Sequence, residues 1–201
     1  MGNFRTIWKH EVAQADKIAK ILLHNKKVAV DWKIMLVPVF LYKVYHYRKN
    51  IGFTRKNFLF TKQLAYDAAK NIFQGKEQAW EFRRIEIQTK GILDKEKKGF
   101  YTEKIRRKQL PEIDLLIKHY LDLFNAKQSK YPKIIREIYQ SKGKYLTFLS
   151  TLQKAEEDVI QAATTTMRKG TKKDRREWFQ KVRETTKKVR MAEAEKIFAG
   201  R

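Results

Sequence analysis

The stretch from Pro111 to Phe124 reads PEIDLLIKHYLDLF and shows the repeat of an amphipathic helix. Its apolar residues recur at spacings of three and four, which brings them to one face of a helix. They are Ile113, Leu116, Ile117, Tyr120, Leu121 and Phe124. Pro111 suits the first position of this helix, where its missing N–H needs no partner. We therefore predict a helix that begins at Pro111 and buries one face in a core.

Similar apolar stripes extend in both directions along the chain of 201 residues. The predicted helices cover about 4–25, 54–75, 76–90, 132–142, 144–169 and 171–198, with a weak boundary at 91–99 and a short basic segment at 102–109. No stretch has a convincing strand pattern, and only three prolines and eight glycines interrupt the chain. The predicted fold is all-α, an antiparallel bundle of six to eight helices with long helical hairpins. We expect an amphipathic helix and an apolar helix in residues 1–52, and a basic helical bundle in 53–201.

The most apolar run lies between Asp31 and Asn50 and reads DWKIMLVPVFLYKVYHYRKN. An apolar centre with Trp, Tyr and Lys at its edges is typical of a membrane interface. The run is shorter than the roughly 20 apolar residues that cross a bilayer, and Lys43 would lie inside any longer span. We therefore predict that the 32–47 segment dips into one leaflet. The predicted membrane-inserting residues are Trp32, Ile34, Met35, Leu36, Val37, Val39, Phe40, Leu41, Tyr42 and Tyr45.

A buried core helix is the alternative interpretation of the same run. Apolar stretches of this length often lie inside a protein rather than in lipid, and Pro38 would kink a helix in either setting. The acid-free, basic surroundings of the run favour the membrane. Both interpretations stay open at this point.

Positive charge dominates the chain, with 46 Lys and Arg against 22 Asp and Glu and a net charge of +24. Such an excess attracts polyanions, which include anionic lipid headgroups, nucleic acid and acidic protein surfaces. Two concentrations of basic residues stand out, one at 43–62 and one at 168–190. The residues predicted to bind an anionic surface are Lys43, Arg48, Lys49, Arg55, Lys56, Lys62, Lys172, Lys173, Arg175, Arg176, Lys187 and Lys188.

Motifs of catalysis and of cofactor binding are missing from the sequence. The chain has no cysteine, no phosphate-binding glycine loop and no histidine spacing that suits zinc or a di-iron site. Glu112 and Glu156 are assigned to helix starts or exposed faces, and His119 to a packed side chain rather than a metal ligand. We expect no catalytic residue, no cofactor, no metal and no small-molecule substrate. No secretory signal is visible, so we expect an intracellular protein.

Three segments, at 32–40, 57–62 and 100–111, resemble a family of small basic bacterial helical proteins of unknown function. They read WKIMLVPVF, NFLFTK and FYTEKIRRKQLP. The resemblance implies no activity, cofactor or site residue. Gly2 and Thr6 match the pattern for N-myristoylation, but the bacterial origin that the resemblance implies weighs against acylation.

These observations predict a non-enzymatic, membrane-associated protein on the cytoplasmic face, with a scaffolding or recruiting role. One alternative is a non-specific RNA-binding protein, in which the 32–47 segment is core and the spread basic residues contact phosphates. The other is an accessory subunit of a larger assembly, in which a protein partner covers that segment.

Overall fold

The computed structural model describes residues 3–24, 51–95, 101–166 and 172–199, which form seven α-helices and no strand. The helices are α1 (Phe4–His24), α3 (Ile51–Phe73), α4 (Gln78–Lys95), α5 (Glu103–Asn125), α6 (Tyr131–Tyr139), α7 (Lys142–Thr166) and α8 (Lys172–Phe198). The prediction of an all-α bundle of six to eight helices is confirmed.

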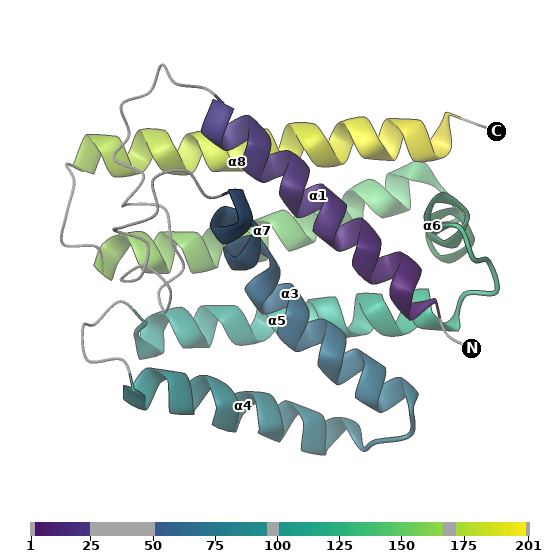
Figure 1. The fold of residues 1–201 in the computed structure, drawn as a ribbon, viewed down its shortest axis with the longest axis horizontal. Coiled ribbons are helices and arrows are strands. Elements are labelled where there is room, and N and C mark those ends of the chain that lie inside the picture. Colours follow the sequence, from purple (N-terminus) through teal and green to yellow (C-terminus); the bar gives the residue numbers. More distant parts are fainter. Residues whose placement is uncertain (1–2, 25–50, 96–100, 167–171, 200–201) are drawn as a thin grey trace.

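The helices form a bundle with two directions of packing. Figure 1 shows α4, α5, α7 and α8 along the long axis of the molecule, while α1 and α3 cross them obliquely. Helix α3 packs on α5, α5 on α7, and α7 on α8, while α1 contacts both α3 and α8. The short helix α6 closes one end against α7 and α8.

Helix α5 supplies the centre of the core, as its apolar stripe predicts. Ile113, Leu116, Ile117 and Tyr120 are fully buried, and they share one cluster with Ile7 of α1. That cluster also receives side chains from α3, α6, α7 and α8, among them Ala65, Ile134, Tyr145 and Ala194. Full burial of one such aliphatic side chain contributes about 1.5–3 kcal/mol, so this cluster stabilises the packing of the helices around α5.

Pro111 does not begin a helix, which corrects the prediction. Helix α5 begins at Glu103, and the Thr102 side chain caps it by accepting a hydrogen bond from the N–H of Ile105 at 3.4 Å. Ile105 and Gln109 are fully buried and continue the stripe that Ile113 and Leu116 carry. A proline inside a helix costs about 3 kcal/mol, and the burial on both sides of exposed Pro111 offsets that cost.

Two other boundaries differ from the predicted ones. Helix α3 begins at Ile51 instead of near residue 54. Helix α4 continues through Gly91 to Lys95 instead of ending near Lys90. Ile92 and Leu93 pack against a small cluster around buried Tyr101 and Ile105, and this contact holds the last turn of α4 in helical form.

Candidate anion-binding surfaces

Apart from Lys62, the residues predicted to contact an anionic membrane fall into three groups. All ten predicted membrane-inserting residues, together with Lys43, Arg48 and Lys49, lie outside the described part of the chain. Arg55 and Lys56 belong to α3, and Lys172 and Arg175 to α8, at positions whose side chains are not described. The exposed members are Lys173, Arg176, Lys187 and Lys188, and all four lie on α8.

Lys62 lies in the interior, which corrects its assignment to a membrane-binding surface. Its side chain is 9% exposed, and its Nζ donates to Glu11 Oε2 at 2.5 Å. The other oxygen of Glu11 accepts a hydrogen bond from the Tyr120 hydroxyl at 3.0 Å. Burial acts to raise the pKa of Glu11, but the Lys62 charge and hydrogen bond outweigh it and lower the pKa to about 2. The positive charge of Lys62 is therefore balanced by the carboxylate of Glu11 inside the bundle.

A second ion pair lies in the same interior, between α7 and α8. Arg190 is 3% exposed and holds Glu156 through two hydrogen bonds of 2.7 and 2.6 Å, a geometry that suits the guanidinium fork. Glu112 of α5 is also buried, so its assignment to an exposed face or helix start was wrong. Burial and the charge of Glu156 raise the pKa of Glu112 to about 8, against the opposing effect of Lys62 and Arg190.

We call these residues the interior ion network, and it joins five helices. Its members are Glu11 of α1, Lys62 of α3, Glu112 and Tyr120 of α5, Glu156 of α7 and Arg190 of α8. The network was not predicted, although the sequence carries a sign of it. Glu11 lies four residues after buried Ile7, and Glu112 four residues before buried Leu116, so both occupy buried stripes.

His119 packs as predicted. Its Nδ1 lies 2.7 Å from the Tyr139 hydroxyl, and its ring stacks on Phe148 with centroids 4.2 Å apart. Burial lowers the pKa of His119 to about 3, so the ring is neutral at physiological pH. Within the described residues, no cluster of three or more histidines and carboxylates is arranged to hold a metal ion.

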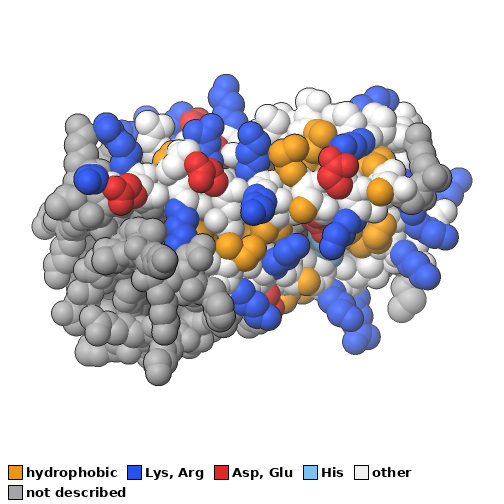
Figure 2. Space-filling view, turned by 90° about the horizontal axis from the view of Figure 1, so that it is seen from above, with side chains coloured by type: hydrophobic (Ala, Val, Ile, Leu, Met, Phe, Trp, Pro, Cys, Tyr) orange, Lys and Arg blue, Asp and Glu red, His pale blue; other side chains and the backbone are white. Residues whose placement is uncertain are grey.

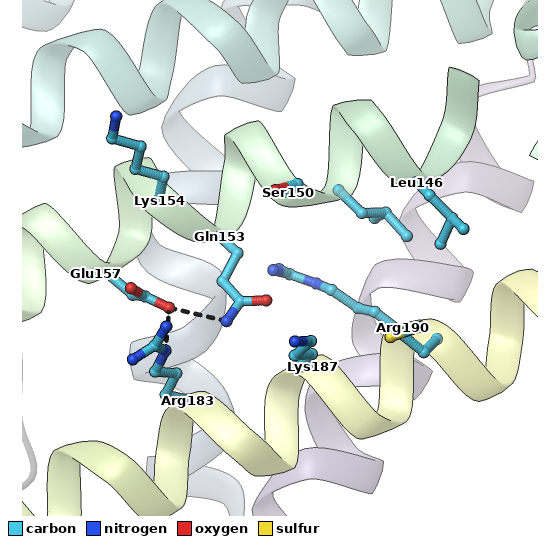
Figure 3. A pocket seen from close by; sticks show the side chains of 10 residues that line it. Leu146, Ser150, Gln153, Lys154, Glu157, Arg183, Lys187 and Arg190 are labelled. Carbon is cyan, nitrogen blue, oxygen red and sulfur yellow. Dashed lines mark hydrogen bonds and ion pairs between the residues drawn. The ribbon is translucent and has the colours of Figure 1, made fainter. Parts of the chain in front are cut away.

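A groove of about 500 Å³ lies between α7 and α8, and we call it the α7–α8 groove. Its lining residues are Leu146, Leu149, Ser150, Gln153, Lys154, Glu157, Arg183, Lys187, Arg190 and Met191. Figure 3 shows Leu146 at one end, and Lys154, Glu157 and Arg183 toward the other. Glu157 accepts from Arg183 and from Gln153, each at 2.8 Å. Among the described residues, neither Lys154 nor Lys187 has an ion-pair partner.

The outer side of α8 is rich in cations. Helix α8 lies at the top of Figure 1, and the view from above shows many Lys and Arg side chains, fewer Asp and Glu, and hydrophobic side chains between them (Figure 2). On α8, Lys187 and Lys188 are exposed, while Lys173 has a weak partner in Glu177 at 4.0 Å. This side of the molecule therefore presents positive charge that ion pairs on α8 do not cancel.

Helix α4 carries the most exposed large apolar side chains of the described residues. Trp80 is 54% exposed and Ile87, two turns later, is 66% exposed. Arg83 and Arg84 line a small hollow with them, and the Lys76 ammonium lies 5.6 Å from the centre of the Trp80 ring. We call Trp80, Ile87, Arg83 and Arg84 the α4 ridge. Helix α4 lies on the edge of the molecule opposite α8 (Figure 1).

The inner side of α4 fixes the orientation of this ridge. Glu81 is fully buried and accepts hydrogen bonds from Asn71 of α3 at 3.0 Å and from Arg84 at 2.9 Å. Ile85 is fully buried on the same side. Because Glu81 and Ile85 anchor one face of the helix, Trp80 and Ile87 must point away from the bundle.

No family model, curated protein or solved structure matches the chain. The candidate surfaces therefore rest on geometry and charge alone. Among the described helices, none has the length and apolar character needed to cross a bilayer.

Proposed function

We propose that this is a non-enzymatic protein that binds peripherally to an anionic membrane surface, on the cytoplasmic face, where it recruits or scaffolds other proteins. The α4 ridge is the observation that carries the proposal. Trp80 and Ile87 are exposed on α4, with Arg83 and Arg84 between them in the chain, and aromatic and aliphatic side chains beside cations suit the headgroup region of a bilayer.

The free energies expected for the apolar and the charged contacts indicate that membrane binding needs both. Full burial of a side chain such as Ile87 contributes at most about 1.5–3 kcal/mol. Each Lys or Arg near an anionic surface adds about 1 kcal/mol. A net charge of +24 supplies many such contacts, but salt screens them, whereas it leaves the apolar contribution of Trp80 and Ile87 in place. The 32–47 segment remains a prediction of a second insertion, based on its sequence alone.

Vesicle flotation tests the proposal. We expect the protein to float more completely with vesicles that contain phosphatidylglycerol than with neutral phosphatidylcholine vesicles. A fraction should stay bound at about 1 M salt, where the screening length falls to roughly 3 Å. Trp80→Ser combined with Ile87→Ser should reduce that salt-resistant fraction, because both side chains are exposed and their loss leaves the core intact.

The matched control replaces Gln78 and Gln88 by serine, on the same helix and at exposed positions. It changes two α4 residues to serine without removing apolar surface, so flotation should stay as in the wild type. RNA added as a competitor tests the alternative that the protein binds any polyanion through charge alone. If RNA removes the protein from vesicles completely and salt abolishes all flotation, charge acts alone and the membrane proposal is wrong.

A further inference from the structure

The α7–α8 groove has two chemically different halves. Leu146, Leu149 and Met191 give it an apolar end. Lys154 and Arg183 lie toward the other end, with the Lys154 side chain pointing away from Arg183, while Lys187 and Arg190 lie between the two ends (Figure 3). A volume of about 500 Å³ falls within the range of roughly 300–1,000 Å³ that is usual for small-molecule sites. A ligand that fills the groove must therefore be apolar at one end and polar at the other.

The charges of the groove define the polar end of such a ligand. Four cations line it, and Glu157 and Glu156 neutralise Arg183 and Arg190. Lys154 and Lys187 remain without an ion-pair partner among the described residues, which leaves two positive charges. A phosphate monoester carries about −1.5 to −2 at pH 7, so one such group balances them.

Arg190 gives the groove a preformed side. Its guanidinium is held by two hydrogen bonds to Glu156 and is almost fully buried, so it does not reorganise when a ligand enters. The exposed Lys154 and Lys187 are free to move toward the anion on their flexible side chains.

We propose that the α7–α8 groove binds one amphiphile with a phosphate monoester headgroup and a single alkyl or acyl chain. The headgroup contacts Lys154 and Lys187, and the chain lies over Leu146, Leu149 and Met191. The inference goes beyond peripheral membrane binding, because it needs neither a bilayer nor the α4 ridge at the other edge of the molecule. The two proposals can therefore fail independently.

Calorimetric titration of the full chain with monododecyl phosphate, kept below its micelle concentration, tests the groove directly. Inorganic phosphate and a neutral dodecyl glycoside serve as comparison ligands. We expect one monododecyl phosphate to bind saturably. The Kd of each comparison ligand should be at least about tenfold higher than that of monododecyl phosphate. Equal binding of inorganic phosphate would overturn the role of the apolar end, and equal binding of the glycoside would overturn the role of the lysines.

Variants on the same two helices locate the site. Lys154→Gln with Lys187→Gln removes both unpaired cations, and we expect it to weaken binding by about tenfold or more. Lys144→Gln with Lys188→Gln makes the same change at exposed positions of α7 and α8 that do not line the groove. This control should bind as the wild type does. If both double variants bind alike, or if the wild type gives no binding, the assignment of the groove is wrong.

Discussion

The interior ion network and the outer surface use charge in opposite ways. Inside, Lys62 is paired with Glu11 and Arg190 with Glu156, so each buried cation meets a carboxylate. Outside, basic residues exceed acidic ones so far that the whole chain carries +24. The buried charges therefore serve the fold, whereas we propose that the surface excess of positive charge attracts a negatively charged partner.

The buried pairs also specify how the helices meet. Lys62 and Glu11 join α3 to α1, and Arg190 and Glu156 join α8 to α7. A buried ion pair contributes little net stability compared with apolar residues of the same size, but the loss of one partner is costly. Replacing one member of a pair should therefore lower the free energy of unfolding strongly, whereas replacing both members should lower it only weakly.

The largest expected effect comes from Lys62→Met, which leaves Glu11 buried without its ammonium partner. We expect the free energy of unfolding to fall by about 3–5 kcal/mol, as for other buried pairs that lose one member. Urea denaturation followed by circular dichroism measures it. A loss below about 1 kcal/mol, the value for an exposed pair, would show that Lys62 and Glu11 are not a buried pair.

A double variant sharpens the comparison. Glu11→Leu combined with Lys62→Met removes both charges and fills the site with apolar side chains. We expect it to be more stable than either single variant, with a coupling free energy of about 1–3 kcal/mol in a double-mutant cycle. Strictly additive losses would contradict the pairing.

Glu112 predicts a pH dependence that the surface carboxylates do not share. Its folded-state pKa is about 8 against an ordinary value of 4.5, so the folded chain keeps a proton that the unfolded chain releases. Its contribution to stability is therefore full below pH 4.5 and is lost as the pH rises toward 8. Glu112→Gln should flatten the dependence of the melting temperature on pH between about pH 5 and pH 8, whereas Glu86→Gln, at an exposed position of α4, should not. An unchanged profile in Glu112→Gln would refute the burial of an ionisable group there.

The smallest effect is expected at an exposed pair. Lys118 donates to Asp114 at 2.6 Å on the outside of α5, and its side chain is 64% exposed. Lys118→Met should change the free energy of unfolding by no more than about 1 kcal/mol, because water screens such pairs. Thermal unfolding of Lys118→Met and Lys62→Met measures the difference between an exposed and a buried pair. Equal losses of stability in the two variants would contradict that difference.

Helix periodicity predicted the apolar part of this fold well. The stripe of α5 and the helices α1, α6 and α8 follow from spacing alone, because a 3.6-residue repeat brings apolar side chains to one face. Pro111 was misplaced because its local preference for a helix start yields to tertiary burial of Ile105 and Gln109. Local preference is a weak guide wherever packing on both sides of a residue favours the helix.

The candidate site was harder to predict, for a physical reason. Lys62 and Glu11 are 51 residues apart, and only the packing of α3 on α1 makes Lys62 an interior cation. Trp80 and Ile87 were recognised as part of a helix, but Phe82 and Ile85 offer that helix a second apolar side. The burial of Ile85 beside Glu81 decides which side faces outward, and that depends on α3 and α5.

The fluorescence of Trp80 in the presence of anionic vesicles tests the central proposal most directly. A chain in which Trp8, Trp32 and Trp178 are replaced by phenylalanine reports on Trp80 alone, and circular dichroism checks its fold. If the α4 ridge enters the headgroup region, the emission should shift to the blue on binding, and lipids with brominated chains should quench it. Emission that stays at the wavelength of water-exposed Trp80, while the protein floats with the vesicles, would contradict the proposal.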